Sequence, residues 1–545
     1  MNKSLWMATL LASSFFAHAQ DYFAPLDSIV KTYEGKDVPG FSVRILKDGK
    51  TLYNNHVGYA NLEKHTKITD ESVFNLGSTS KQFTAACIVL LHQQGKLNLN
   101  DNLRKYIPEF PAYAEKITLL NLLTHTSGLK DYLILATIQG DENEEYTNAQ
   151  IKEMMVALQP DFAPGEKWNY CNTGYWCLAQ IVEKVSGKSI GEFARKNIFK
   201  PLGMKNTAYY LRPANDIKNK AIGYEKNNNV YTPTNPDERA IAGAGVYSTL
   251  GDLEKWLVEM QTHRVFGDAF WKSMTEDDAY KNESLTYTKG LFIYPYRTKT
   301  MINHGGDVSG YHPFLGYFPE DKVGLIILTN DDNFKRNDAI IASVDNLLGF
   351  KYRYPSKTIG VAPAPATKID FAAYSGKYKV GEDQYVLIEE TAGKLVLNYL
   401  AEAVHAPLSP TSEPNRFVIE DTPISMVFTD IKDGKAQKIK STEGEEITEL
   451  SRVEQMPENP AYKVYEGSYH CTGIKKNITF FTAEGLLYIK LTNGKTDWIV
   501  QEEEDSFGTR YGKISFKRDT TGNVTGFTYN HERAKNLEFI KQKSE

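Results

Sequence analysis

The sequence predicts a multidomain α/β (α+β) protein, in which a domain of mixed strands and helices precedes two small antiparallel β-barrel modules. Three observations predict this fold class. Strand-like segments lie at both ends of residues 38–349, with helical segments between them. A Pro/Ala-rich stretch follows this region. Beyond it, a pattern of short strands and turns occurs twice.

Each end of residues 38–349 contains a predicted antiparallel hairpin. At the N-terminal end, Phe41–Leu46 and Thr51–Gly58 flank Asp48-Gly49, a residue pair typical of two-residue hairpin turns. The other predicted elements are a hairpin of Phe314–Phe318 and Val323–Thr329, and helices over Thr118–Leu123, Tyr175–Val185 and Asp338–Leu348. We therefore expect the outer segments to form a sheet and the middle segments to form helices.

An internal repeat predicts the two C-terminal modules. The segment Tyr374-Ser-Gly-Lys-Tyr378 recurs as Tyr465-Glu-Gly-Ser-Tyr469. Each copy has about the length of a small closed barrel. The Ala-Pro-Ala-Pro-Ala sequence before the first copy is typical of a stiff, extended linker. The predicted boundaries are 20–350 for the first domain, 351–368 for the linker, and 369–456 and 461–545 for the modules.

Residues 1–19 are predicted to form an export signal. Lys3 supplies a basic start, Leu5–Phe16 an apolar stretch, and Ala17-His18-Ala19 the small-residue pattern of a cleavage site. The apolar stretch is too short to span a bilayer, and no later segment is long enough. We therefore expect a periplasmic or secreted protein without a membrane span.

The composition excludes several kinds of partner. The net charge is only -5 over 545 residues and there is no basic block, so we expect no nucleic acid partner. Four cysteines are too few for a disulfide scaffold. No cluster of His, Cys and Asp has the spacing of zinc ligands, so we expect no metal and no cofactor. The sequence leaves the oligomeric state open.

Ser78 and Lys81 stand one helical turn apart, just before the apolar run Phe83–Leu91. Serine is a poor nucleophile at neutral pH and needs a nearby base, which a lysine three residues later can supply. The start of a helix also offers unpaired backbone N–H groups that favour developing negative charge. This arrangement indicates acyl transfer. The alternative is that Ser78 only caps the helix.

Tyr170 and Asn172 follow a Pro-Gly turn and open the next helical run. A tyrosine hydroxyl near a lysine ammonium has its phenolate stabilised, which suits a general base. The alternative is a buried tyrosine beside a capping asparagine.

Further along, His304-Gly305-Gly306-Asp307 lies on a predicted edge strand, where the glycines let a substrate approach the backbone. The alternative there is a glycine bulge with a surface histidine.

In this order, Ser78-x-x-Lys81, Tyr170-x-Asn172 and His304-Gly-Gly306 resemble the signature of serine β-lactamases and penicillin-recognising enzymes. The resemblance is greatest to the class C-related branch, which includes esterases and D-aminopeptidases. It covers most of residues 35–350. His125 resembles a structural turn residue of that family. The supporting stretches are Leu122–Leu129, Ala242–Thr249, Gly316–Pro319 and Leu325–Asn330.

The resemblance implies a β-lactamase/transpeptidase-like domain with an antiparallel sheet flanked by helices and the site between them. Ser78 would form an acyl-enzyme. Lys81 and Tyr170 would share the handling of protons, and which of them is the acylation base stays open. Asn172 would position the substrate and Lys81. The N–H groups of Ser78 and Asp307 would hold the oxyanion, with His304, Gly305 and Gly306 lining the substrate site.

One departure from the family pattern bears on the substrate. The β-lactamases of this group present a Lys-Thr-Gly motif, whose cation attracts the drug carboxylate, but His304 stands in place of that lysine. A His-x-Gly motif is similar to D-aminopeptidase-type members, which carry two lipocalin-like, eight-stranded barrels after the catalytic domain. Asp307 suggests a preference for substrates with a free amine.

We therefore expect an exported serine hydrolase that cleaves amide or ester bonds of small peptides or peptide-like substrates, with D-residues among the candidates. One alternative is a β-lactamase or penicillin-binding protein, similar to a D-Ala-D-Ala carboxypeptidase. Another is a ligand-binding protein without catalytic activity on the same fold. The C-terminal modules either bind a separate ligand or cover the catalytic cleft with a loop.

Overall fold

The computed structural model describes residues 22–543 except for 140–145, 211–216, 228–229, 235–243, 283–285, 353–368, 381–384, 392–393, 400–403, 420–421, 423, 444–445, 455–459, 472, 475, 484 and 510–511. The predicted export signal at 1–19 and most of the predicted linker at 351–368 lie outside these residues. In the part of the chain that is described, no helix has the length and apolar character needed to cross a bilayer.

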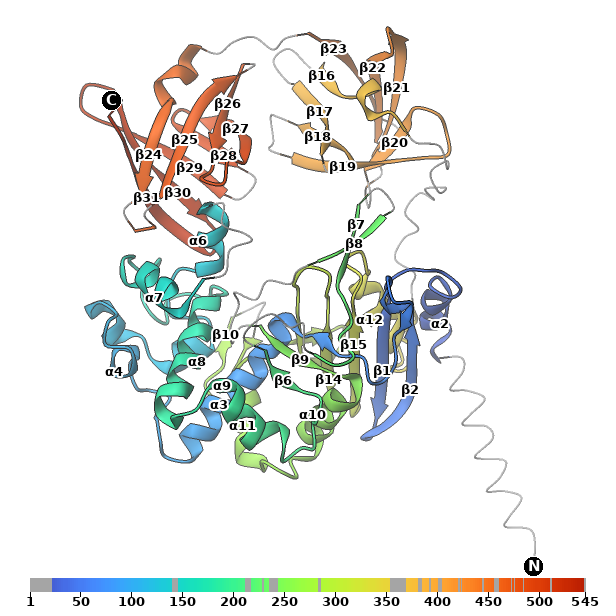
Figure 1. Ribbon diagram of the computed structural model, residues 1–545, viewed down its shortest axis with the longest axis vertical. Coiled ribbons are helices and arrows are strands. Elements are labelled where there is room, and N and C mark those ends of the chain that lie inside the picture. The colour runs from blue at the N-terminus through green and yellow to red at the C-terminus, as the bar shows by residue number, and fades with distance from the viewer. Residues whose placement is uncertain are drawn as a thin grey trace, which may run out of the picture.

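The first domain contains an eight-stranded antiparallel sheet in the order β10-β11-β12-β13-β14-β15-β1-β2 (Figure 1). Its strands are β1 (Phe41–Lys47), β2 (Lys50–Val57), β10 (Tyr280–Lys281), β11 (Thr286–Tyr287), β12 (Phe292–Tyr296), β13 (Lys299–Gly305), β14 (Phe314–Phe318) and β15 (Val323–Thr329). Both predicted hairpins are confirmed. Asp48 and Gly49 both have positive φ, as the tight hairpin turn requires. Because β1 pairs with β15, the two ends of the domain meet within one sheet.

Helices cover both faces of this sheet. On one face, α2 (Ala24–Lys31) and α12 (Arg336–Val344) share an apolar cluster with inward residues of β1 and β15. On the other face, α10 (Leu250–Thr262) packs against the same two strands. Every residue of β15 is buried, as expected for a strand covered on both sides. Helix α12 begins two residues before the predicted start and ends at Val344, where the chain turns instead of continuing to Leu348.

The helical region is built around α3 (Lys81–Gln93), which is buried along almost its whole length. It packs against α8 (Asn172–Ser186), and α8 packs against α5 (Leu119–Leu123). The other helices of the domain are α4 (Leu103–Tyr106), α6 (Tyr132–Gln139), α7 (Asn148–Val156), α9 (Ile190–Ala194) and α11 (Asp268–Thr275), with shorter turns η1 (Gly77–Ser80), η2 (Ala112–Lys116) and η3 (Arg195–Phe199). The short strands are β3 (Tyr59–Asn61), β4 (Thr66–Lys67), β5 (Phe74–Asn75), β6 (Ala208–Tyr209), β7 (Tyr224–Asn227), β8 (Val230–Pro233) and β9 (Val246–Ser248).

Two closed eight-stranded antiparallel barrels follow, which confirms the predicted architecture. The first consists of β16 (Gly376–Lys379), β17 (Tyr385–Thr391), β18 (Lys394–Tyr399), β19 (Val404–Pro410), β20 (Arg416–Ile419), β21 (Ile424–Lys432), β22 (Lys435–Glu443) and β23 (Glu446–Val453), after the turn η5 (Phe371–Ala373). The second consists of β24 (Gly467–Cys471), β25 (Lys476–Ala483), β26 (Leu486–Lys490), β27 (Thr496–Glu503), β28 (Ser506–Thr509), β29 (Gly512–Arg518), β30 (Val524–His531) and β31 (Ala534–Lys541), after η6 (Pro460–Tyr465).

The tyrosine repeat has the same structural role in both barrels. The hydroxyl of Tyr378 donates to the carbonyl of Tyr374 at 2.9 Å, and the hydroxyl of Tyr469 donates to the carbonyl of Tyr465 at 2.8 Å. These buried rings lie among other aromatic rings of the barrel interiors. Each tyrosine pair therefore ties the entry turn of its barrel to the first strand.

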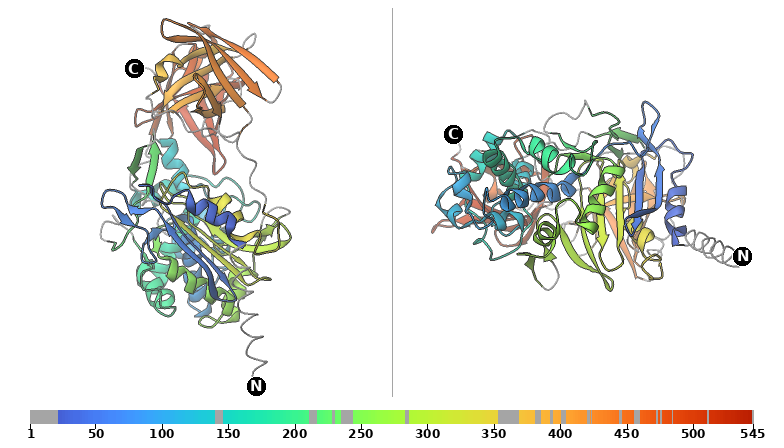
Figure 2. Two further views of the ribbon diagram at one scale, coloured as in Figure 1. Left: turned by 90° about the vertical axis from the view of Figure 1, so that its right-hand side faces the viewer. Right: turned by 90° about the horizontal axis from the view of Figure 1, so that it is seen from below.

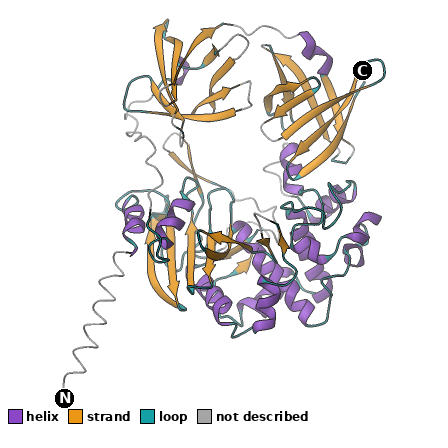
Figure 3. Ribbon diagram, turned by 180° about the vertical axis from the view of Figure 1, so that it is seen from behind, coloured by secondary structure: helices purple, strands orange, loops and turns teal. Residues whose placement is uncertain are grey.

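The second barrel is packed directly on the helical region. Its interior and the core of the helical region form one continuous apolar cluster. The Thr492 hydroxyl donates to the carbonyl of Gln139 at the end of α6. Figures 1 and 3 show the second barrel above α6 and the helices, whereas the first barrel lies beside it, above the β7–β8 hairpin. The side view in Figure 2 shows both barrels at the same end of the molecule.

Candidate active site

Ser78 lies in the tight 3₁₀ turn η1, which leads directly into α3. Gly77 enters this turn with a φ of +46°, and its N–H donates to Asn75 Oδ1 at 2.8 Å. A 3₁₀ turn has about three residues per turn, so Lys81 comes to lie in line with Ser78. Ser78 lies within η1, and the N-cap residues are Leu76 for η1 and Ser80 for α3, so Ser78 does not cap either helix. The hydroxyl lines a cavity instead.

Lys81 is completely buried, and its amine is held against Ser78. Its Nζ donates to Asn172 Oδ1 at 2.9 Å and to Ser78 Oγ at 3.3 Å. Burial lowers the pKa of Lys81 to about 7, although the nearby charge of Asp131 opposes this shift. A large share of this lysine is therefore a neutral amine at neutral pH. It can accept the proton of the Ser78 hydroxyl.

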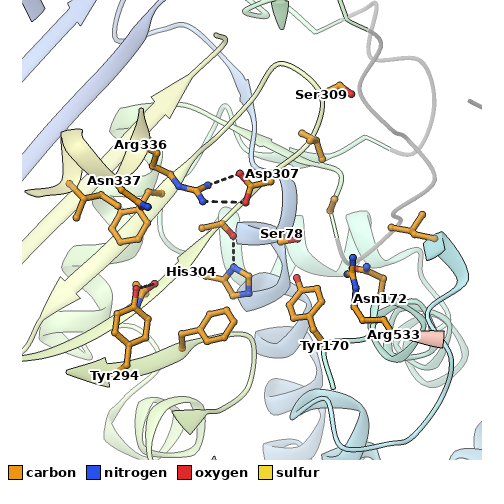
Figure 4. Close-up of a pocket in the computed structure, with 18 residues that line it drawn as sticks. Ser78, Tyr170, Asn172, Tyr294, His304, Asp307, Ser309, Arg336, Asn337 and Arg533 are labelled. Carbon is orange, nitrogen blue, oxygen red and sulfur yellow. Dashed lines mark hydrogen bonds and ion pairs between the residues drawn. The ribbon is translucent and has the colours of Figure 1, made fainter. Parts of the chain in front are cut away.

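Tyr170 lies next to Ser78 on the helical side of the site (Figure 4). Its ring centroid is 4.7 Å from Lys81 Nζ and 4.3 Å from the ring centroid of His125. Burial raises the pKa of Tyr170, while a hydrogen bond with Ser78 partly opposes the shift. The phenol therefore stays protonated at neutral pH. At neutral pH, Lys81 is thus partly a neutral amine, whereas Tyr170 is a protonated phenol. Lys81 is therefore the stronger candidate for the acylation base.

Asn172 is the first residue of α8, and Asp131 fixes its orientation. The Asp131 carboxylate accepts from the Asn172 backbone N–H at 2.9 Å and from its Nδ2 at 2.8 Å. Because Nδ2 is held in this way, Oδ1 faces the Lys81 amine. Asp131 is fully buried. No sequence pattern marks Asp131 as part of the site, because a single acidic residue before a helix is also a common capping pattern.

The turn after β13 runs beside the Ser78 backbone. A Cβ atom placed on Gly306 would lie 2.3 Å from the carbonyl oxygen of Leu76 and 3.0 Å from the Ser78 nitrogen, so only glycine fits. A Cβ atom on Gly77 would lie 3.1 Å from the Asp307 nitrogen. Neither the Ser78 N–H nor the Asp307 N–H donates a hydrogen bond to another described residue. Two backbone donors therefore remain for an oxyanion beside the Ser78 hydroxyl.

His304 faces the same cavity from β13 as a neutral ring. It is 2 % exposed, and Tyr287 contacts its Nε2 at 3.3 Å. Burial and the neighbouring Lys81 lower the pKa of His304 to about 3. It therefore carries no positive charge with which to attract a carboxylate. Gly305, the next residue, lies against the guanidinium of Arg336, where a Cβ atom would be only 3.3 Å from Cζ.

The charge of Asp307 is already balanced by two cations. Arg336 Nη1 donates to Asp307 Oδ1 at 2.9 Å, and His312 Nδ1 contacts the same oxygen at 2.7 Å. Burial lowers the pKa of His312, but its hydrogen bonds with Asp307 and Asp332 raise it to about 9. The structure therefore does not favour the expectation that Asp307 attracts a substrate amine.

A cavity of about 700 Å³ opens beside Ser78 (Figure 4). Figure 4 shows Ser78 between two walls, with Tyr170, Asn172 and Arg533 on the helical side and His304, Asp307 and Arg336 on the sheet side. Arg533 comes from the second barrel and has no local motif that would mark it in the sequence. Among the described residues, no group of three or more His, Cys, Asp or Glu side chains is placed to hold a metal ion.

Comparisons with known proteins agree with this geometry. The family model described as beta-lactamase matches residues 26–348. The chain is similar to penicillin-binding protein 4* of Bacillus subtilis, with 29% identity over 74% of this chain and 93% of the relative. It is 24% identical to the D-aminopeptidase of Brucella anthropi over 94% of this chain and 96% of the relative. The structure of the octameric penicillin-binding protein homologue from Pyrococcus abyssi matches with a TM-score of 0.56 and 25% identity, covering 78% of this chain and 99% of that one.

Proposed function

This chain belongs to the beta-lactamase family and is a serine hydrolase, and we propose that it cleaves amide or ester bonds of small peptides or peptide-like substrates through a Ser78 acyl-enzyme. The observation that carries the proposal is the contact of a buried, easily deprotonated lysine with the Ser78 hydroxyl. A serine with such a base and two free backbone donors has the parts that acyl transfer needs.

In the proposed acylation step, the neutral Lys81 amine accepts the Ser78 proton while Oγ attacks the substrate carbonyl. The N–H groups of Ser78 and Asp307 stabilise the oxyanion that develops. Tyr170 keeps its proton, and its phenol can donate a hydrogen bond to the serine oxygen once Ser78 has lost its own proton. It is then placed to pass a proton to the leaving amine or alcohol and to recover one from Lys81. Water completes the cycle by releasing the acid.

We propose small peptides rather than carboxylate-bearing lactams as substrates because of the sheet-side wall. His304 is neutral there, and the charge of Arg336 is taken up by Asp307. A lactam carboxylate would thus find no strong cation at this wall. The similarity to a D-aminopeptidase along almost the whole chain, barrels included, supports peptides and makes D-residues candidates. The apolar start of the sequence supports export to the periplasm or the medium.

The proposal is tested by labelling with a fluorophosphonate probe and by turnover of D- and L-aminoacyl amides and short esters. We expect Ser78→Ala to abolish both. Full labelling of Ser78→Ala would refute the assignment of the nucleophile.

The similarity to penicillin-binding protein 4* makes penicillin binding the second candidate. Rapid turnover of nitrocefin, with slow turnover of the amides and esters, would favour that candidate.

A further inference from the structure

The turn between β30 and β31 carries part of the second barrel into the catalytic cavity. Its backbone is held there by three contacts. The Arg533 carbonyl accepts from the Asp131 N–H at 2.9 Å, and the Glu532 carbonyl accepts from Asn169 Nδ2 at 2.8 Å. The Lys535 N–H donates to the carboxylate of Asp161 at 3.0 Å. The turn is therefore fixed on both sides of Arg533.

A buried ion pair strengthens this attachment. The Lys130 amine pairs with the Asp161 carboxylate, and their side chains are 4 % and 1 % exposed. The same amine also donates to the Lys535 carbonyl. A buried charge needs its full set of partners, and the barrel turn supplies some of them. The position of Arg533 is therefore set by the packing of the second barrel on the helical region.

The Arg533 guanidinium lies at the cavity wall with N–H groups that donate to no described residue. It lies 5.8 Å from the Tyr170 ring centroid, and its Nη1 is 3.6 Å from Asp131 Oδ2, beyond hydrogen-bond distance. The Asp131 carboxylate already accepts from the Asn172 side chain and backbone and from the Leu133 N–H. Within the described part of the chain, the guanidinium donates no hydrogen bond. Its side chain is 31 % exposed.

The neighbouring charges leave this wall receptive to an anion. The Asp131 carboxylate raises the pKa of Lys81 and lies 3.6 Å from Arg533 Nη1. His531 is neutral at pH 7, because burial and Arg533 lower its pKa. The Glu532 side chain is exposed and does not line the cavity. At the opposite wall, the Arg336 guanidinium donates to Asp307 and to the Gly306 carbonyl, whereas the Arg533 guanidinium is ion-paired with Asp131 at 3.6 Å and donates no hydrogen bond to a described residue.

We propose that Arg533 binds a carboxylate of the substrate, so that the enzyme prefers acyl groups with an acidic substituent at the Asn172 end of the cavity. Arginine suits this role because its planar fork of N–H groups matches the two oxygens of a carboxylate. The inference rests on the proposed function, since it names the substrate class of that same site. The carboxylate is either the side chain of an acidic residue or part of an N-acyl group.

The test measures ligand binding to Ser78→Ala protein by calorimetry, so that it does not depend on turnover. Two ligand pairs differ only in charge: glutamyl against glutaminyl amide, and N-succinyl-alanine amide against its succinamide. Each pair is used in both enantiomers. The glutamyl pair reports a side-chain carboxylate and the succinyl pair an N-acyl carboxylate. Arg533→Gln and Lys535→Gln are each combined with Ser78→Ala, and each removes one positive charge from the same turn. Lys535→Gln is the control, because the Lys535 side chain is exposed and does not line the cavity.

We expect the acidic member of at least one pair to bind about 10- to 100-fold more tightly than its amide, the usual range for a charge-assisted hydrogen-bonded pair. Arg533→Gln should reduce this ratio to near one, and Lys535→Gln should preserve it. A ratio near one in the Ser78→Ala protein, an unchanged ratio in Arg533→Gln, or no binding of any ligand overturns the inference. Detection of a Ser78 acyl adduct by intact mass in the wild type tests the proposed function separately.

Discussion

The pH dependence of acylation tests the assignment of Lys81 as the base. Its pKa is about 7, so about 9% of the amine is neutral at pH 6 and about 91% at pH 8. Because only the neutral amine can accept the Ser78 proton, kcat/KM for a neutral amide or ester substrate should rise about tenfold between these pH values. The assay is kcat/KM measured with an uncharged substrate across pH 5.5 to 9.

Two substitutions should move this rise in opposite directions. The carboxylate of Asp131 raises the pKa of Lys81 and the guanidinium of Arg533 lowers it. Asp131→Asn should therefore shift the midpoint of the profile to lower pH, and Arg533→Gln should shift it to higher pH. The midpoint is informative even where the rate itself falls, as we expect for Asp131→Asn because Asn172 loses part of its support.

Specific results would refute this reasoning. A profile that is flat between pH 6 and 8, or that falls, would show that the lysine amine does not act as the base. A rise only in the alkaline range would indicate Tyr170 instead, because burial raises the pKa of its phenol. Shifts of the same sign in the two variants would contradict the electrostatic origin of the Lys81 pKa.

Two further predictions follow from close packing and from buried charge. Gly306→Ala should lower kcat by about 100-fold, because the added methyl group displaces the turn after β13 from the Ser78 N–H. The circular dichroism spectrum should stay unchanged. Wild-type activity in this variant would show that the turn does not hold the oxyanion. Lys130→Ala leaves the buried Asp161 carboxylate without its cation and should cost about 3 kcal/mol in urea unfolding. Lys130→Ala/Asp161→Ala should recover part of that loss, and a double variant less stable than the single one would contradict the account.

The sequence predicted the helices, strands and turns that are marked by residue patterns within a short segment. The Asp48-Gly49 turn, the two hairpins and the α5 and α8 helices all follow from patterns within a few residues. The barrels were predicted from the tyrosine repeat, and the structure gives the reason, since Tyr378 and Tyr469 make the same hydrogen bond to the turn before the first strand. The ordered motifs around Ser78 were likewise visible, because each places its residues on one short element.

The parts of the site that the sequence did not reveal depend on contacts between distant segments. Asp131 acts through Asn172, which is 41 residues away in the chain, and no local pattern marks that contact. Arg336 begins a helix, and only the folded structure places its guanidinium against Asp307. These partners are why the structure does not favour the expectation that Asp307 attracts an amine. A charge read from the sequence says nothing about the partners that neutralise it.

The second barrel is best understood as a wall of the active site. Its interior is filled by rings such as Phe480, Phe516 and Phe527, which pack at centroid distances of 5.1 to 5.7 Å. Rings packed so closely form a well-packed core in this part of the barrel. Because this core is continuous with that of the helical region, the barrel can hold Arg533 at a fixed place in the cavity. Substitutions in this one barrel turn would then change the substrate preference, while Ser78, Lys81 and Tyr170 stay in place as the reacting groups.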